Sequence, residues 1–235
     1  MQSAYRKNHS TETALLKVTN DILMDMNSQH AVLLVLLDLS AAFATVDHSA
    51  LMRRLQTSFG ISGAPLDWFK LYLSARSQRV SIPGALSDCL PLDWGVPQGS
   101  CLGPLLYIIY SSKLWTSLNV TFQILTVMRM IHKKYLSFKP DDLSSQQDPV
   151  TAMQNCIDDI RSRMEHDKLL LNDEKTEFLI IGTRQQLSKL NISSISVGTS
   201  AITKSSVVRN LGSYIDFKPS MNSHINKVCN ASLGG

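Results

Sequence analysis

The feature that most constrains the fold is an unbroken apolar run at residues 31–37 (AVLLVLL), which is followed directly by Asp38. A run this short cannot cross a bilayer, and its wholly apolar character predicts a strand that is buried on both faces of a sheet. The run delivers a carboxylate at its C-terminal end, where burial is costly unless the charge is paired or binds a cation. Asp38 is therefore a candidate metal-binding residue, with capping of the next turn as the ordinary alternative.

Composition narrows the class of protein. The chain has 235 residues, of which 44% are hydrophobic, and a formal net charge of +4. It can bury a real core, and its mild basicity permits a polyanionic partner without requiring one. Four widely spaced cysteines exclude a disulfide scaffold or a zinc ribbon and favour a reducing compartment. Because the N-terminus has no apolar signal region, we expect a soluble intracellular protein with no membrane partner, in either the nucleus or the cytoplasm.

Apolar periodicity predicts the order of helices and strands. Apolar residues spaced three and four apart indicate a helix capped by Ser10 and further helices at 48–59, from Pro65, at 102–114 and at 150–170. Strands are predicted at 78–82, 89–94, 177–181, 192–197 and 210–215, with a polar linker at 140–149. The elements come in blocks rather than in strict alternation, which indicates an α+β fold in one domain.

The loop at residues 95–100 (GVPQGS) is the second candidate for a functional site. Its two glycines allow a ligand to approach the backbone closely, and Gln98 carries both a donor and an acceptor. In isolation, an ordinary strand-to-helix turn is the simpler interpretation. The aspartate pairs at 141–142 and 158–159 are interpreted as solvated surface, because adjacent helical residues do not face one another.

Five blocks of sequence, taken together and in order, resemble the reverse transcriptase of non-LTR (LINE-type) retrotransposons. The blocks are 2–6 (QSAYR) with 10–12 (STE), 37–43 (LDLSAAF) with 46–48 (VDH), 95–100 (GVPQGS) with 102–105 (LGPL), 171–172 (LN) with 175–178 (KTEF), and 210–212 (NLG) with Asp216. The resemblance implies a right-hand polymerase palm, an antiparallel sheet backed by helices, with partial fingers and no thumb. The expected division of a truncated domain at 1–235 is partial fingers at 1–30, palm at 31–216, and the start of the connection to a thumb at 217–235.

The resemblance also implies roles for individual residues near the nucleotide. In that family the Asp38 position binds Mg²⁺ with help from the backbone carbonyl of the next residue, here Leu39. The Phe43 position is a steric gate that senses the sugar 2′-OH, the group that separates ribose from deoxyribose. The loop that lines the nucleotide and template pocket carries Pro97, Gln98 and Gly99.

Two further matches concern the pyrophosphate and the primer. Lys175 matches a catalytic motif whose lysine is placed near the leaving pyrophosphate, and Leu211 with Gly212 resembles the primer grip. The partners that the resemblance implies are an RNA template, a DNA primer and deoxynucleoside triphosphates. The oligomeric state stays open.

One motif of the family is absent from the sequence. Nucleotidyl transfer uses two Mg²⁺ ions about 3.5–4 Å apart and needs several converging carboxylates, which the family takes from the Asp38 position and a Tyr-Ala-Asp-Asp hairpin. Where that hairpin is expected, residues 126–133 read TVMRMIHK, and residues 120–139 contain no Asp, Glu, Asn, Gly or Pro. Neither the carboxylates nor turn-forming residues are therefore present. Ala44 is a further departure, because the family often has Asp there.

The codons of this stretch suggest how the motif was lost. Met128 and Met130 must both be encoded by ATG, and one permitted coding string for residues 126–133 is ACT GTT ATG CGG ATG ATA CAC AAA. When it is translated from its third base, this string encodes Cys-Tyr-Ala-Asp-Asp-Thr-Gln, and the second Asp codon is forced by Met130 followed by Ile131. The resulting hypothesis is a pair of compensating insertions or deletions, one near Ile124 and the other between His132 and Tyr135.

The loss of these carboxylates has a direct chemical consequence. With one carboxylate where three oxygen donors are needed, two-metal binding is expected to fail, and the positioning of the reactants with it. The expected protein is a reverse transcriptase domain by descent that does not polymerise. Two alternatives stay open: a functional polymerase whose coding sequence was misread across this stretch, and a non-catalytic nucleic-acid-binding module whose affinity falls steeply with salt.

Overall fold

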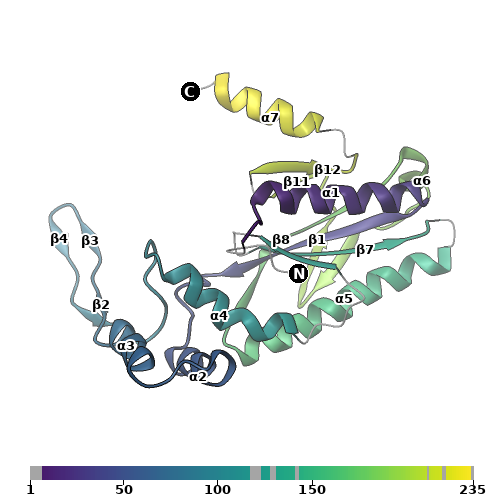
Figure 1. Ribbon diagram of the computed structural model, residues 1–235. Helices are drawn as coiled ribbons and strands as arrows, with labels where there is room; N and C mark the ends of the chain where they lie inside the picture. The colour runs from purple at the N-terminus through teal and green to yellow at the C-terminus, as the bar shows by residue number, and fades with distance from the viewer. Residues whose placement is uncertain are drawn as a thin grey trace. The chain divides into compact units, whose positions relative to one another are not determined.

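The computed structural model describes residues 7–116, 123–127, 131–140, 143–210, 212–218 and 221–233 (Figure 1). The chain forms two compact units, which are described separately below. The first comprises Met1–Leu39, Asn119–Arg161 and Leu171–Gly235, and the second comprises Ser40–Leu118 and Ser162–Leu170. In the described part of the chain, no helix has the length and apolar character needed to span a membrane.

The first unit is built on a four-stranded sheet in the order β6-β7-β1-β8. The bounds of these strands are Gln123–Val127, Ile131–Phe138, Ala31–Ser40 and Leu170–Ile181. In β1, residues 31–37 are all buried, because a sheet neighbour lies on each edge and apolar side chains cover both faces. The predicted buried strand is therefore confirmed, and it continues as far as Ser40.

Two long helices pack on this sheet. Helix α1, Thr11–Asn27, begins at a capping box in which the Ser10 side chain accepts from the Thr13 amide, as the sequence predicted for its start. Its buried residues Ala14, Val18 and Ile22 join the even-numbered residues of β1 in one apolar cluster. Helix α5, Leu143–His166, buries Met153, Ile157, Ile160 and Met164, and Figure 1 shows α1 and α5 on opposite sides of the sheet.

The structure corrects the sequence prediction at three boundaries. The polar linker predicted at 140–149 is wrong from Leu143 onwards, because α5 has already begun there and accommodates Pro149 inside the helix. Strand β8 begins at Leu170 rather than at 177, so the preceding helix ends earlier than predicted, at His166. The single strand predicted at 210–215 is in fact two, β11 (Val207–Asn210) and β12 (Ser213–Asp216), because Gly212 turns the chain between them.

The remaining elements of the first unit are short. Helix α6 spans Arg184–Ser188, and strands β9 (Ser194–Val197) and β10 (Ser200–Thr203) form a second small hairpin. Helix α7, Asn222–Leu233, follows β12 and is largely exposed. Of the sequence predictions, the strand near 192–197 is confirmed by β9.

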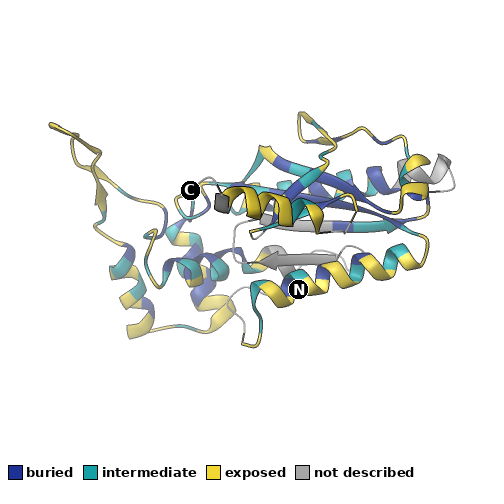
Figure 2. Cartoon of the chain, turned by 90° about the horizontal axis from the view of Figure 1, so that it is seen from above, coloured by how far each residue is buried: buried dark blue, intermediate teal, exposed yellow. Residues whose placement is uncertain are grey.

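The second unit contains helices α2 (His48–Phe59), α3 (Ala64–Leu73) and α4 (Gly103–Thr116), the C-terminal end of α5 and a long hairpin. Helices α2, α3 and α4 lie close to their predicted positions. The hairpin contains β2 (Ser77–Gln78), β3 (Ser81–Ile82), β4 (Ala85–Leu86) and β5 (Leu90–Pro91), with β2 paired to β5 and β3 paired to β4. Its residues are exposed along almost their whole length (Figure 2).

A buried ion pair ties the segment after α5 into the second unit. Arg54 of α2 forms a salt bridge with Asp167, and the Tyr110 hydroxyl of α4 donates to the Asp167 carbonyl oxygen. The Arg54 guanidinium also lies over the Tyr110 ring, 5.1 Å from its centroid. These contacts hold α2 and α4 to the segment that follows α5.

Candidate functional site

Asp38 lies near the C-terminal end of β1, directly after the buried run. Leu37 before it and Leu39 after it are buried, whereas Asp38 is only half-buried, so its carboxylate is less enclosed than its neighbours. The placement of Asp38 at the end of a buried strand is as the sequence predicted. Its role as a metal ligand stays a prediction.

The pairing of β6 and β7 brings Val127 and Ile131 to the same end of the sheet as Asp38. Strand β7 runs antiparallel to β1, from the pair Ala31–Phe138 to the pair Leu37–His132. Val127 in turn pairs with Ile131 at the start of β7, so these two residues lie at the Asp38 end of β1. The sequence offers no turn-forming residue in this stretch, yet β6 and β7 pair with each other on either side of it, because residues of high β-propensity flank it. Residues 128–130 themselves lie outside the described residues.

The donor set at this end does not fit a pair of divalent ions. By sequence, the connection consists of Met128, Arg129 and Met130, none of which carries a carboxylate. Within the ranges that the structure describes, no three His, Cys, Asp or Glu side chains form a group that could hold a metal ion. Because Mg²⁺ prefers hard oxygen ligands and a metal pair needs several of them, Asp38 alone is insufficient.

Phe43 lies in a tight turn at the start of the second unit. The amides of Ala44 and Thr45 donate to the Ala41 carbonyl oxygen at 2.7 and 3.1 Å, and Ala41 takes a positive φ of 46°. The Phe43 ring packs against Tyr107 of α4, with ring centroids 5.5 Å apart. Burial raises the pKa of the Tyr107 hydroxyl, so this support for Phe43 stays uncharged.

The loop at 95–100 is hydrogen-bonded to the turn that carries Phe43. The Gly95 amide donates to the Val46 carbonyl at 2.7 Å, and the Val96 amide donates to the Phe43 carbonyl at 2.8 Å. Gly95 has a φ of +83°, and a Cβ there would lie 2.8 Å from the Phe43 oxygen and 2.9 Å from Ala44 Cα. Only glycine fits this approach, which is the physical reason for the first glycine of the block.

The other end of the loop is tied to helix α4. The Ser100 hydroxyl accepts from the Gly103 amide at 2.9 Å and donates to the Pro97 carbonyl at 2.7 Å. Gln98 and Gly99 are exposed at the tip between these anchors. The structure therefore brings Phe43 and the loop of Pro97, Gln98 and Gly99 together in one hydrogen-bonded assembly, although their contact with a nucleotide stays a prediction.

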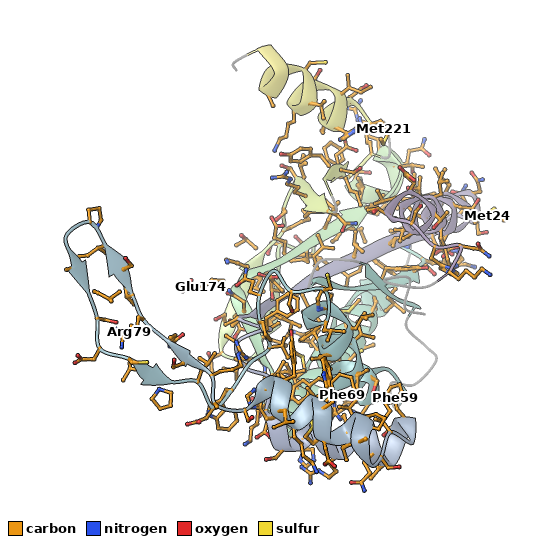
Figure 3. All side chains as sticks on the ribbon, turned by 60° about the vertical axis from the view of Figure 1, so that its left-hand side comes forward. Met24, Phe59, Phe69, Arg79, Glu174 and Met221 are labelled. Atoms are coloured by element: carbon orange, nitrogen blue, oxygen red, sulfur yellow. The ribbon has the colours of Figure 1, made fainter. Side chains whose placement is uncertain are left out.

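The remaining predicted site residues belong to the first unit. Lys175 is exposed on β8, beside Glu174, which is labelled in Figure 3, and its amide donates to Asn172 Oδ1 at 3.3 Å. Gly212 is exposed in the turn between β11 and β12 with a φ of +85°, while Leu211 lies outside the described residues. Asn210, directly before that turn, is fully buried.

Sequence reasoning missed two residues that hold the loop. His48 Nε2 donates to the Gly95 carbonyl oxygen at 2.7 Å, and Arg76 Nη1 donates to the same oxygen at 2.9 Å. His48 belongs to the block at 46–48, so the resemblance was a signal from which it could have been identified. Arg76 carries no local signal, because its role depends on a contact with a residue nineteen positions later.

Comparison with known proteins gives relatives at the level of sequence. A family model described as "Reverse transcriptase (RNA-dependent DNA polymerase)" matches residues 1–215. The RNA-directed DNA polymerase from mobile element jockey of Drosophila melanogaster is 33% identical over 123 residues, which are 51% of this chain and 13% of that protein. The probable RNA-directed DNA polymerase from transposon X-element of the same species is 34% identical over 113 residues, 47% of this chain and 12% of that protein.

Solved structures with a similar fold include telomerases. Apo telomerase from Candida tropicalis, truncated from the C-terminal domain, superposes with a TM-score of 0.58 at 15% identity, covering 92% of this chain and 40% of that one. Telomerase from the same species with a TWJ fragment of telomeric RNA gives 0.56 at 13% identity, covering 91% and 34%. These likenesses confirm the predicted α+β palm fold. With the family match over residues 1–215 and the mobile-element relatives, they show that the chain belongs to the reverse transcriptase (RNA-dependent DNA polymerase) family and is a domain of the LINE type.

Proposed function

We propose that this chain is the palm-bearing part of a retrotransposon reverse transcriptase that keeps the scaffold of the nucleotide pocket but does not polymerise. The observation that carries the proposal is the register of β1 and β7. This register brings Val127 and Ile131 to the Asp38 end of the sheet, and the sequence between these two residues supplies two methionines and an arginine in place of carboxylates. The family generally uses divalent metal ions, and the residues here do not provide for a Mg²⁺ pair.

The proposed substrates are those of the family. An RNA template, a DNA primer and a deoxynucleoside triphosphate would meet the loop of Pro97, Gln98 and Gly99, with Phe43 as the gate against the 2′-OH. The support is that Phe43 and this loop are held to each other by the Val96–Phe43 hydrogen bond and carry the family's residue types. Lys175, Leu211 and Gly212 belong to the first unit. The resemblance supports the proposal that Lys175 meets the pyrophosphate and that Leu211 and Gly212 meet the primer.

The test is primer extension by the purified chain and by a repaired variant. In the second reading frame, the codons centred on residues 128–131 encode Tyr, Ala, Asp and Asp, so the repair is Met128→Tyr, Arg129→Ala, Met130→Asp and Ile131→Asp. We expect no Mg²⁺-dependent extension of an RNA-templated DNA primer by the chain as it stands, and extension by the repaired variant. Extension by the unrepaired chain that is lost in Asp38→Ala would contradict the proposal.

A matched control separates the effect of the carboxylate charge from the effect of a changed turn sequence. It carries Met128→Tyr and Arg129→Ala with Met130→Asn and Ile131→Asn, which keeps the size of the side chains and removes the charge. The Asn control should stay inactive, because amide oxygens do not supply the negative charge that the metal pair requires. Equal activity of the Asp and Asn variants would show that the carboxylates are not the missing element.

A second candidate function is nucleic-acid binding without catalysis. An aromatic and basic cluster on the first unit favours it: Lys227 Nζ lies 4.4 Å and Arg209 Cζ 5.7 Å from the centroid of the Tyr214 ring. The His224 ring lies 6.4 Å from the same ring. Exposed cations around an aromatic ring suit a phosphate backbone.

Salt dependence tests this second candidate. Binding of single-stranded RNA should weaken steeply with added salt, and Lys227→Gln with Arg209→Gln should lower the slope of log affinity against log salt. The matched control is Lys70→Gln, a cation paired with Asp67 on the other unit. Salt-insensitive binding, or an equal loss in the control, would dismiss this function.

A further inference from the structure

The carbonyl oxygen of Gly95 accepts two side-chain hydrogen bonds from two separate segments of the second unit. His48 Nε2 comes from the first residue of α2, and Arg76 Nη1 comes from the base of the exposed hairpin. A carbonyl has no hydrogen to give, so both nitrogens donate, and the bond from Arg76 is charge-assisted. Two donors from side chains on one backbone oxygen, in addition to two backbone hydrogen bonds beside it, exceed what an ordinary strand-to-helix turn requires.

The peptide that receives these bonds is the one that holds Phe43. The Gly95 carbonyl and the Val96 amide belong to the same peptide group, and the Val96 amide donates to the Phe43 carbonyl at 2.8 Å. Donors on a peptide oxygen polarise the group and make its N–H a stronger donor, so hydrogen bonds in such a chain strengthen one another. The chain of contacts therefore runs from His48 and Arg76, through the 95–96 peptide, to the backbone of Phe43.

Arg76 is itself fixed at the base of the hairpin. Its backbone carbonyl accepts from the Leu92 amide at 2.8 Å, and Ala75 before it takes a positive φ of 53°. The side chain thus begins from a backbone that is already paired across the hairpin. An arginine placed in this way keeps the hairpin base and the loop at 95–100 in one arrangement.

We propose that His48 and Arg76 are positioning residues that lock the loop at 95–100 onto the Phe43 turn and thereby set the discrimination between deoxyribose and ribose. The consequence for the sugar rests on the function proposed above, in which Phe43 is the gate. The lock itself does not, because it is a statement about hydrogen bonds within this chain. Both residues act through the backbone of the loop and touch no substrate in this scheme.

Hydrogen exchange on the intact chain tests the lock. Arg76→Met should lower the protection of the Val96 amide about tenfold or more, as expected for loss of a hydrogen bond to a charged group. Arg76→Lys and His48→Gln keep a donor and should retain most of the protection, whereas His48→Leu should lower it. The matched control is Arg79→Met, an exposed arginine on the same hairpin that is labelled in Figure 3. Unchanged protection in Arg76→Met, or an equal fall in Arg79→Met, would overturn the proposal.

Sugar selection tests the consequence in the repaired variant. Adding Arg76→Met to it should raise incorporation of ribonucleotides relative to deoxyribonucleotides several-fold, and Arg76→Lys should restore the ratio. Adding Arg79→Met should leave the ratio unchanged. An unchanged ratio with lowered Val96 protection would refute the link to the sugar. A repaired variant that does not polymerise counts against the proposed function alone, and the exchange experiment still decides the lock.

Discussion

Leu37 of β1 pairs with His132 of β7, and this pair fixes which residues of the hairpin belong at the end of the sheet next to Asp38. Ile131 is the residue before His132, and Val127 pairs with it from β6. In the second reading frame, the codons that end at Ile131 are the ones that encode Asp-Asp. The register of the sheet and the codon argument, which share no data beyond the sequence, therefore point to the same positions for the lost carboxylates.

The first prediction concerns the bases that encode this hairpin. If the hypothesis of compensating insertions or deletions is right, the gene uses GTT for Val127 and CGG for Arg129. Only GTT gives Tyr in the second frame, and only CGG gives both Ala and the first Asp, because AGG would give Glu in place of Ala. The measurement is sequencing of the gene and its transcript across the codons for Ile124 to Tyr135. Another valine or arginine codon would sink the hypothesis. If sequencing shows inserted or missing bases, so that the true reading frame encodes Tyr-Ala-Asp-Asp, an active polymerase becomes the leading interpretation instead.

The second prediction compares two glycines of one loop. Gly95→Ala should lower the free energy of unfolding by about 3 kcal/mol or more, because the Cβ meets the backbone of Phe43 and Ala44 at a positive φ. Gly99→Ala is the matched control, since Gly99 has nearly the same φ, +82°, but nothing within 4 Å of the added Cβ. It should cost only about 1–2 kcal/mol, the price of the left-handed conformation. Urea unfolding of both variants measures the difference, and equal costs would remove the close approach as the reason for Gly95.

The local pattern of apolar residues was enough to predict the helices and strands that bury those residues in the core. The stripe of α1 and the run of β1 were predictable, because burial on one face of a helix or both faces of a strand leaves a periodic record. The start of α5 was not predictable in this way. Proline is read locally as a helix breaker, yet Pro149 lies inside a helix whose stability comes from tertiary packing further along.

In the candidate site too, local sequence features and resemblance identify some residues, whereas contacts between distant residues are not visible in the sequence. The resemblance assigned Phe43 and the Gln98 loop to the site, and that role stays a prediction. The glycines of the loop were expected to let a ligand approach, whereas Gly95 lies against the backbone of Phe43 and of the residue after it. The bonds of His48 and Arg76 to Gly95 were not predictable, because they join residues 47 and 19 positions apart through one carbonyl oxygen. The sequence analysis did not predict the pairing of β6 with β7, because the stretch between them has no turn-forming residues. Strand β6 nevertheless pairs with β7 along its whole length.

The third prediction concerns the buried ion pair between Arg54 and Asp167. Arg54 is 4% exposed, so Arg54→Met leaves a mostly buried carboxylate without its partner and should cost about 3–5 kcal/mol of stability. The double variant Arg54→Met with Asp167→Leu should be more stable than Arg54→Met alone. Lys70→Met is the control: its pair with Asp67 is exposed on both sides, and such pairs contribute about 0–1 kcal/mol. A double variant no more stable than the single one would contradict this account.

The fourth prediction is a pH dependence that runs through Asp47, the N-cap of α2. Burial by itself raises the pKa of this carboxyl, but hydrogen bonds from Lys168 and the Ala50 amide, with the Lys168 charge, outweigh burial and hold the pKa below its ordinary value of 3.8. A carboxyl with a depressed pKa in the folded state contributes stability that is fully present above the unfolded pKa and is lost as the pH falls through the folded pKa.

Lys168→Met tests this dependence by removing the cation and leaving the Ala50 cap. The variant should be less stable than the parent near neutral pH, and its stability should fall less between about pH 4 and lower values, because the pKa of Asp47 then lies closer to its unfolded value. Lys70→Met is again the matched control and should follow the parent curve, since its partner Asp67 is exposed. The measurement is the free energy of unfolding in urea from pH 7 down to pH 3. Parallel curves for the parent and Lys168→Met would show that the Lys168 contact does not set the pKa of Asp47.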